Sequence, residues 1–150
     1  MLIQDDEYVF AISANGGHLT EMKLALSAFS GNVFWITFDG SDSKNLVGML
    51  LTDYHNRLLK FFTVSISAVK FFYLHRPKTI ISTGGLIALP FAFISWFLGV
   101  KFIFFECGTR IRDVSKTAKL IAILHREIYV QSESLCALNP KRYKYIGSIL

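Results

Sequence analysis

A glycine pair followed by a histidine stands directly after the first apolar run of the chain. Asn15, Gly16, Gly17 and His18 follow the run, and leucine and methionine then recur with helical spacing. This is the pattern of a strand, a tight turn and a helix N-terminus. Glycine lets the backbone approach a ligand, and the free N–H groups of a first helical turn attract anions. We therefore predict a phosphate or diphosphate site at this turn. His18 would be a general base, a neutral donor or a residue with only a local role.

Two further loops carry residues suited to the same ligand. Gly84 and Gly85 follow a short β-branched run, and Glu106 closes a run of aromatic and aliphatic residues. A carboxylate at the end of a strand is well placed for catalysis, so we predict Glu106 as a second catalytic residue. Arg110 and Arg112 follow it, and they would either bind phosphates or hold Glu106 in an internal ion pair.

Apolar runs alternate with helical patterns along the whole chain. We expect strands near 8–14, 32–38, 79–82, 101–105, 127–131 and 143–146, with helices near 57–74, 86–98 and 114–125. Strands separated by helices indicate an α/β fold, here one Rossmann-like parallel sheet over residues 1–150 with helices on both faces. Ligands of such sheets lie at the carboxyl ends of the strands, so the three loops should meet in one crevice.

Several other site types are weakly matched or excluded. The first turn lacks the G-x-G-x-x-G spacing of dinucleotide-binding proteins, although Asp39 after the second strand would suit a ribose. There is no P-loop, the histidines are scattered, and no His/Cys spacing indicates a metal site. Glu21 is placed to cap the helix that follows the turn, and Cys107 has no evident base partner. We expect no cofactor.

Charge and hydropathy raise the question of a membrane. Hydrophobic residues make up 52% of the chain, and mean hydropathy is +0.41. Residues 1–53 hold two Lys/Arg against seven Asp/Glu, whereas residues 54–150 hold fourteen against four. A basic half suggests a surface that faces anionic lipid or another polyanionic ligand, or else an ordinary solvated surface. We expect no nucleic-acid partner.

The long helix at 57–74 combines aromatic and basic residues, as a helix lying in the headgroup layer does. The residues predicted to bind the membrane are Lys60, Phe61, Phe62, Lys70, Phe71, Phe72, Arg76 and Lys78. The alternative is a core helix that packs on the sheet. A separate possibility is the segment 79–100, which has 22 residues without a charge and is long enough to span a bilayer.

In order along the chain, the motifs resemble one family. Residues 13–22 resemble the glycine–histidine opening of the membrane-anchoring subunit of the two-part N-acetylglucosaminyltransferase of lipid-linked oligosaccharide synthesis, and of similar capsule and exopolysaccharide proteins. Residues 81–90 resemble its second glycine loop, and residues 104–112 its Glu-x-x-x-Arg segment. Residues 128–132 and 145–150 resemble its closing strands.

The resemblance implies the N-terminal half of a split GT-B glycosyltransferase. Such a chain would sit peripherally on the cytoplasmic face of the cell membrane and bind a polyprenyl-diphosphate-linked saccharide. It would recruit a separate donor-binding subunit, share a UDP-sugar at the common cleft and have little activity alone. Two alternatives remain open at this stage, a stand-alone nucleotide-binding oxidoreductase that uses Asp39 and a small non-catalytic integral membrane protein.

Overall fold

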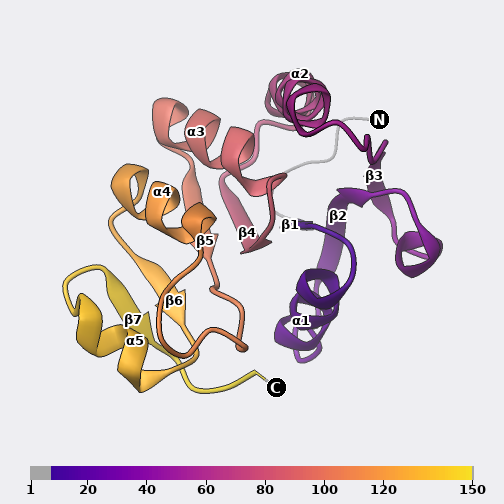
Figure 1. Ribbon diagram of the computed structural model, residues 1–150. Helices are drawn as coiled ribbons and strands as arrows, with labels where there is room; N and C mark the ends of the chain where they lie inside the picture. Colours follow the sequence, from indigo (N-terminus) through magenta and orange to yellow (C-terminus); the bar gives the residue numbers. More distant parts are fainter. Residues whose placement is uncertain (1–7, 150) are drawn as a thin grey trace.

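The computed structural model describes residues 8–149 and shows strands and helices in alternation (Figure 1). In chain order the elements are β1 (Tyr8–Ser13), α1 (Gly17–Ala25), β2 (Asn32–Phe38), the 3-10 turn η1 (Ser41–Ser43), β3 (Gly48–Leu51), α2 (Arg57–His75), β4 (Thr79–Gly84), α3 (Ala88–Leu98), β5 (Lys101–Phe104), α4 (Lys116–Leu124), β6 (Ile128–Val130), α5 (Glu133–Leu138) and β7 (Tyr143–Tyr145).

The strands form a parallel sheet in the order β3-β2-β1-β4-β5. β6 and β7 pair in parallel beside it, and a single bridge from Phe105 to Tyr129 joins them to the end of β5. β1 and β4 lie at the centre, and their side chains are largely buried, as expected for apolar strands covered on both faces. The Rossmann-like α/β fold predicted from the sequence is confirmed.

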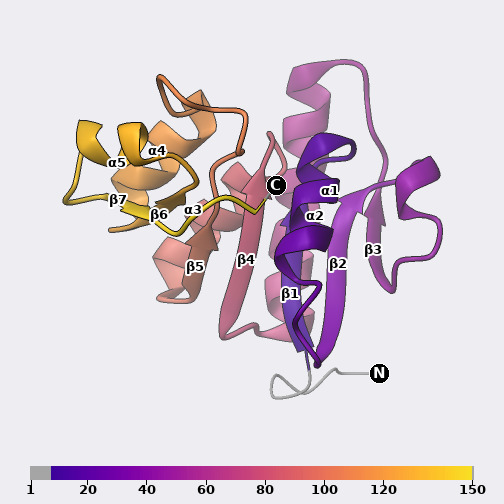
Figure 2. The same ribbon diagram turned by 90° about the horizontal axis from the view of Figure 1, so that it is seen from below.

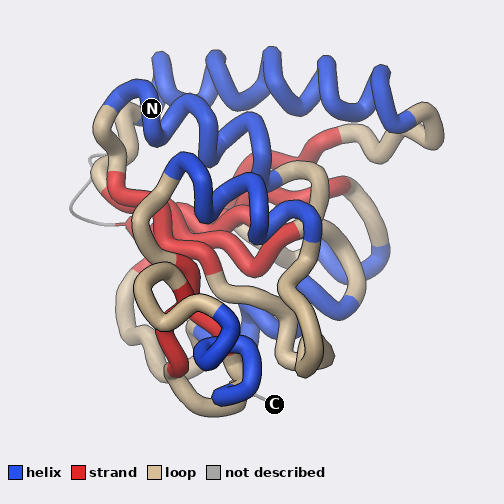
Figure 3. The backbone as a smooth tube through the Cα atoms, turned by 60° about the vertical axis from the view of Figure 1, so that its left-hand side comes forward, coloured by secondary structure: helices blue, strands red, loops and turns tan. Residues whose placement is uncertain are grey.

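Helices cover the two faces of the sheet unequally. α2, α3 and α4 lie on one face, and α1 lies on the other (Figures 1 and 2). α2 is the longest helix; it packs against α3, which packs in turn against α4 (Figure 3). This three-helix layer buries a continuous aromatic core against the central strands.

The core corrects part of the predicted membrane surface. Phe71 is 0% exposed, and its ring lies edge-on to Phe10 and Phe91, with ring centroids 5.1 and 5.6 Å away. Phe72 is also buried and packs beside Phe91. Edge-to-face pairs of this kind stabilise a core beyond their buried area. Phe71 therefore holds α2 to the sheet instead of facing lipid, and Phe72 is largely buried beside it.

The ends of α2 explain why this segment forms one long helix. The Asn56 side chain accepts hydrogen bonds from the amides of Leu58 and Leu59, which caps the helix N-terminus. Arg76 takes a left-handed conformation with φ 46°, and Pro77 follows it. Proline cannot continue a helix, so α2 ends where the sequence predicts.

The strand and helix predicted within residues 79–100 are confirmed, the spanning alternative is wrong, and two short elements were not predicted. The uncharged segment 79–100 is not one spanning helix, because it divides into β4, a glycine turn and the 11-residue helix α3. β3 and α5 were not predicted; they have only four and six residues, too few for a clear periodicity. β3 depends on Gly48, where a Cβ would lie 1.9 Å from the carbonyl oxygen of Trp35 on β2.

Candidate functional site

A basic cleft of about 780 Å³ lies at the carboxyl ends of the central strands. It is lined by residues of three loops together with the first residue of α2 and the start of α4. The lining residues are His18, Arg57, Gly85, Glu106, Cys107, Thr109, Arg110, Asp113, Val114, Ser115, Lys116, Thr117 and Lys119. The three loops predicted to converge do meet here. We call this site the basic cleft.

The first loop is the turn between β1 and α1. Gly16 has φ 76°, a conformation that glycine adopts readily and other residues rarely. Its carbonyl accepts the amide of Thr20, and no side chain caps the helix. By helix geometry, the amides before Thr20 have no acceptor within α1. Gly16 and Gly17 are exposed at this helix start, and His18 enters the cleft lining.

The second loop approaches the first closely because it contains no Cβ atoms. Gly84 and Gly85 have φ 114° and 87°, and a Cβ at Gly85 would lie 2.5 Å from the Cβ of Ala14. The Thr83 hydroxyl also donates to the carbonyl of His18 at 2.7 Å. These contacts lock the two turns together and fix the position of His18 at the cleft.

Glu106, predicted as a catalytic residue, lines the cleft with a carboxylate that is already hydrogen-bonded. Its side chain is 1% exposed, and its oxygens accept the amides of Cys107 at 2.9 Å and Ser115 at 2.6 Å. Within the described residues, no arginine forms an ion pair with it, so the predicted internal Glu–Arg pair is wrong. Glu106 fixes both ends of the third loop, and its catalytic role stays a prediction.

The cations of the third loop and its surroundings face the cleft. Arg57, Arg110 and Lys116 line it, and none of them has an ion-pair partner among residues 8–149. Lys119 is different because it bonds to Asp113 at 2.6 Å, and this bond holds the pKa of Asp113 below its usual value. Arg110 thus fits the predicted phosphate-binding role by its location. Arg112 lies in the same loop but outside the cleft lining.

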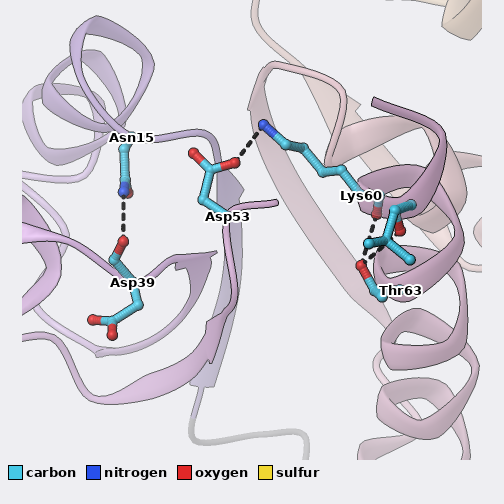
Figure 4. A network of polar contacts seen from close by, with 6 residues as sticks. Asn15, Asp39, Asp53, Lys60 and Thr63 are labelled. Carbon is cyan, nitrogen blue, oxygen red and sulfur yellow. Dashed lines mark hydrogen bonds and ion pairs between the residues drawn. The ribbon is translucent and has the colours of Figure 1, made fainter. Parts of the chain in front are cut away.

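Asn15 and Lys60 border a smaller adjoining pocket of about 360 Å³, which shares Arg57 with the basic cleft. Asn15 donates to the carbonyl of Asp39 at 3.3 Å (Figure 4). It also accepts the Thr37 hydroxyl at 2.8 Å, so it ties the first turn to β2. Lys60 forms an ion pair with Asp53, also drawn in Figure 4. Lys60 therefore lines this pocket, and its membrane contact stays a prediction.

One side-chain cluster beside the cleft was missed by the sequence reasoning. One ligand atom each of His18, Glu21 and Cys107 lies within 4.8 Å of the other two. Glu21 does not cap α1 as predicted; it is 3% exposed and accepts the amide of Gly108 at 2.8 Å. The chain separates these residues widely, so only the contact between the first and third loops brings them together.

An apolar groove runs across the three-helix layer. It joins two pockets of about 630 and 410 Å³ that share Val69, Phe93 and Ile94. Its other lining residues are Phe61, Ser65, Leu89, Pro90, Leu120, Ile123, Leu124, Phe72, Tyr73, Arg76, Phe97 and Leu98. Phe97 is 76% exposed and Ile123 is 72% exposed, so large apolar side chains face outward here. We call this surface the apolar groove.

Two of the remaining predicted membrane residues, Phe61 and Arg76, line this groove. Phe61 lines it, and Phe62 is exposed on the same helix. Lys70 and Arg76 are exposed along α2, and Lys78 is exposed just after it. α2 is the one helix of the described residues with the length and hydropathy to cross a membrane, but four of its side chains are buried against the fold.

The cleft and the groove share their structural elements. α2 contributes Arg57 to the cleft and Phe61 to the groove, four residues later. α4 contributes Lys119 to the cleft and Leu120 to the groove. Gly85 lines the cleft, and Leu89 and Pro90 of α3 line the groove. The two surfaces therefore occupy neighbouring stretches of α2 and α4.

Comparison with solved structures identifies the class of fold. Acinetobacter baumannii MurG superposes with a TM-score of 0.73 and 15% identity over 95% of this chain and 46% of MurG. S. aureus MnaA, in a co-structure with UDP, superposes with a TM-score of 0.68 and 11% identity over 94% of this chain and 43% of MnaA. The UDP-GlcNAc 2-epimerase of Methanocaldococcus jannaschii superposes with a TM-score of 0.65 and 15% identity over 85% of this chain and 40% of the epimerase. No family model and no curated protein matches the sequence.

These similarities show that this chain has the fold of a GT-B Rossmann-like domain. The chain spans less than half the length of each of the three structures. At such low identity the comparison establishes the fold alone, and the chemistry has to be argued from the residues of the site.

Proposed function

We propose that this chain is the acceptor- and membrane-binding half of a two-subunit UDP-sugar glycosyltransferase. The enzyme extends a polyprenyl-diphosphate-linked oligosaccharide in capsule or exopolysaccharide synthesis. This chain holds the lipid-linked acceptor at the cytoplasmic face of the membrane as a peripheral protein. A separate GT-B half binds the donor sugar.

The observation that carries the proposal is that α2 and α4 each contribute residues to both the basic cleft and the apolar groove. A diphosphate needs cations and free amides, and a polyprenyl chain needs an apolar trough. The cations are Arg57, Arg110 and Lys116 in the cleft. The apolar trough is formed by the following turns of α2 and α4. A free nucleotide would use the cleft alone and would leave the groove without a ligand.

The solved structures bear on which part of a GT-B protein this chain corresponds to and on the donor. MurG, MnaA and the epimerase each match over 40–46% of their length, which is about one of the two halves of a GT-B protein. MnaA was solved with UDP, and the epimerase is named for UDP-GlcNAc. Both names support a UDP-sugar as the donor, bound at the cleft that the two halves would share.

The cleft residues then take distinct roles. Arg110 neutralises the diphosphate, while Glu106 holds the loop that carries Arg110. His18 faces the cleft beside the amides of the first turn. It either deprotonates the acceptor hydroxyl or donates a hydrogen bond to the diphosphate. Phe61, Phe62, Lys70, Arg76 and the exposed side chains of α3 and α4 contact the membrane around the acceptor.

The test is to express the chain with and without the glycosyltransferase subunit encoded beside it. Transfer from a panel of UDP-sugars to a polyprenyl-diphosphate-linked saccharide should require both chains, and the two should co-purify. Full activity of the isolated chain, or failure to form a complex, would contradict the proposal. NAD is the control ligand in calorimetry, because the oxidoreductase alternative requires binding at Asp39.

A further inference from the structure

We propose that His18, Glu21 and Cys107 form a zinc-binding site on the wall of the basic cleft. One ligand atom from each side chain lies within 4.8 Å of the others. A neutral imidazole, a carboxylate and a thiolate are all zinc ligands, and the thiolate disfavours hard cations such as Mg²⁺ or Ca²⁺. Ligand atoms around tetrahedral zinc lie roughly 3.3–3.8 Å apart. Displacements of the three ligand atoms by about 1 Å would therefore bring them to zinc-binding distances.

Two unsatisfied polar atoms point to a missing partner. The Nδ1 atom of His18 and the Oε2 atom of Glu21 are buried and have no hydrogen-bond partner in the structure. Glu21 is 3% exposed. A carboxylate oxygen that is buried without a partner is costly unless it binds a cation or a donor. A cation between these two atoms would satisfy both of them.

The surrounding contacts already orient the three groups as outer-shell partners of a metal do. The amide of Gly108 donates to Oε1 of Glu21 at 2.8 Å, which leaves Oε2 for a metal. The Thr109 hydroxyl lies 3.1 Å from the sulfur of Cys107 and can donate to a thiolate. The thiol now lies 3.3 Å from Oε1 of Glu21, and zinc would replace its proton, which passes to solvent.

His18 and Cys107 line the basic cleft, which gives zinc an entry path and an open fourth position. Three protein ligands with one position left for water or a ligand oxygen are typical of non-structural zinc sites. Coordination through Nδ1 would also fix the other ring nitrogen of His18 as a donor. This inference concerns metal binding alone and does not depend on the proposed transferase activity.

The test uses the untagged full chain, stripped with a chelator and exchanged into metal-free buffer. Zinc should bind at one equivalent in competition with a chromophoric chelator and release about one proton per ion at pH 7. Cobalt should give a thiolate charge-transfer band. Cys107→Ser should remove the band, and both it and Glu21→Gln should weaken zinc binding at least 10-fold. Cys136→Ser, which alters the other cysteine, should match the wild type.

The proposal fails if zinc does not bind stoichiometrically, or if Cys107→Ser and Cys136→Ser bind it equally. Circular dichroism checks that each variant is folded. If Cys107→Ser does not fold, X-ray absorption of the zinc-loaded wild type decides the question. One sulfur ligand among nitrogen and oxygen ligands supports the site, and a spectrum without sulfur overturns it.

Discussion

The basic cleft and the apolar groove differ in chemistry although the same segments build both. In the cleft, α2 and α4 present arginine and lysine, and the adjoining loops present free amides and His18. One turn further along, the same helices present phenylalanine, leucine and isoleucine. The proposed amphiphilic acceptor would contact the cleft with its diphosphate and the groove with its apolar chain.

The contrast between the two faces of the sheet supports this interpretation. On the face covered by α1, Leu24 is the one large apolar side chain of that helix that is exposed among the described residues. On the other face, α2, α3 and α4 expose many such side chains around the groove. A soluble domain normally exposes apolar residues singly, so a contiguous set of this kind marks an interaction surface.

The largest effect should come from the cleft. In the complex with the donor-binding subunit, His18→Ala should lower the transfer rate about 10²–10⁴-fold if His18 is the base. Vesicle binding should stay unchanged, since His18 lies outside the groove. The measurement is kcat with saturating acceptor. A rate equal to that of the wild type would remove His18 from the chemistry.

The groove should control membrane binding in the opposite way. Phe97→Ser combined with Ile123→Ser should weaken partition into phosphatidylglycerol vesicles about 30-fold, if each side chain loses roughly 1 kcal/mol of partial burial. Leu138→Ser is the matched control, because Leu138 is an exposed apolar residue of α5. Vesicle co-sedimentation measures the effect. Equal losses in the control and the groove variant would show that the groove is not the contact surface.

The contact between the first two loops should matter for stability. Gly85→Ala should lower the free energy of unfolding by about 3 kcal/mol, because it adds left-handed strain and a clash with Ala14. Gly99→Ala, at φ 70° with open space around it, should cost about 1 kcal/mol for strain alone. Urea unfolding compares the two. Equal losses would mean that the loops do not pack as closely as described.

The basic residues beside the groove should have a smaller effect. Lys70→Gln and Arg76→Gln should each weaken binding to anionic vesicles about 5-fold, since a cation near such a surface contributes about 1 kcal/mol. Binding to neutral phosphatidylcholine vesicles should not change, and added salt should reduce the difference. Unchanged binding to anionic vesicles would leave the apolar side chains as the whole membrane contact.

The smallest predicted effect is on pH dependence. Burial among aromatic rings lowers the pKa of His75 below its usual value of 6.5, and burial likewise lowers the pKa of His125. As pH falls through 6.5, the unfolded chain takes up protons before the folded chain does, so Tm should fall. His75→Phe should make the Tm curve between pH 7.5 and 5.5 flatter, whereas the exposed-site variant His55→Gln should not.

The sequence predicted the sheet well because its long strands and helices carry clear signals. β2 and α2 match their expected ranges closely, since each has a clear pattern of apolar residues and a turn-forming residue after its end. The site was harder to predict because it depends on contacts between distant loops. Nothing near Glu21 indicates that it packs against Gly108, and the alternation of apolar residues in α2 does not reveal which of its phenylalanines face the sheet.

The most direct test of the central claim is whether one molecule binds the cleft and the groove together. Farnesyl diphosphate, farnesol and inorganic diphosphate can be titrated into the full chain by calorimetry. We predict that farnesyl diphosphate binds at least 10-fold more tightly than either fragment. Arg110→Gln should weaken the binding of both diphosphates. Ile123→Ser should weaken the binding of farnesyl diphosphate but not that of inorganic diphosphate. Equal affinity for farnesyl diphosphate and inorganic diphosphate would contradict the account.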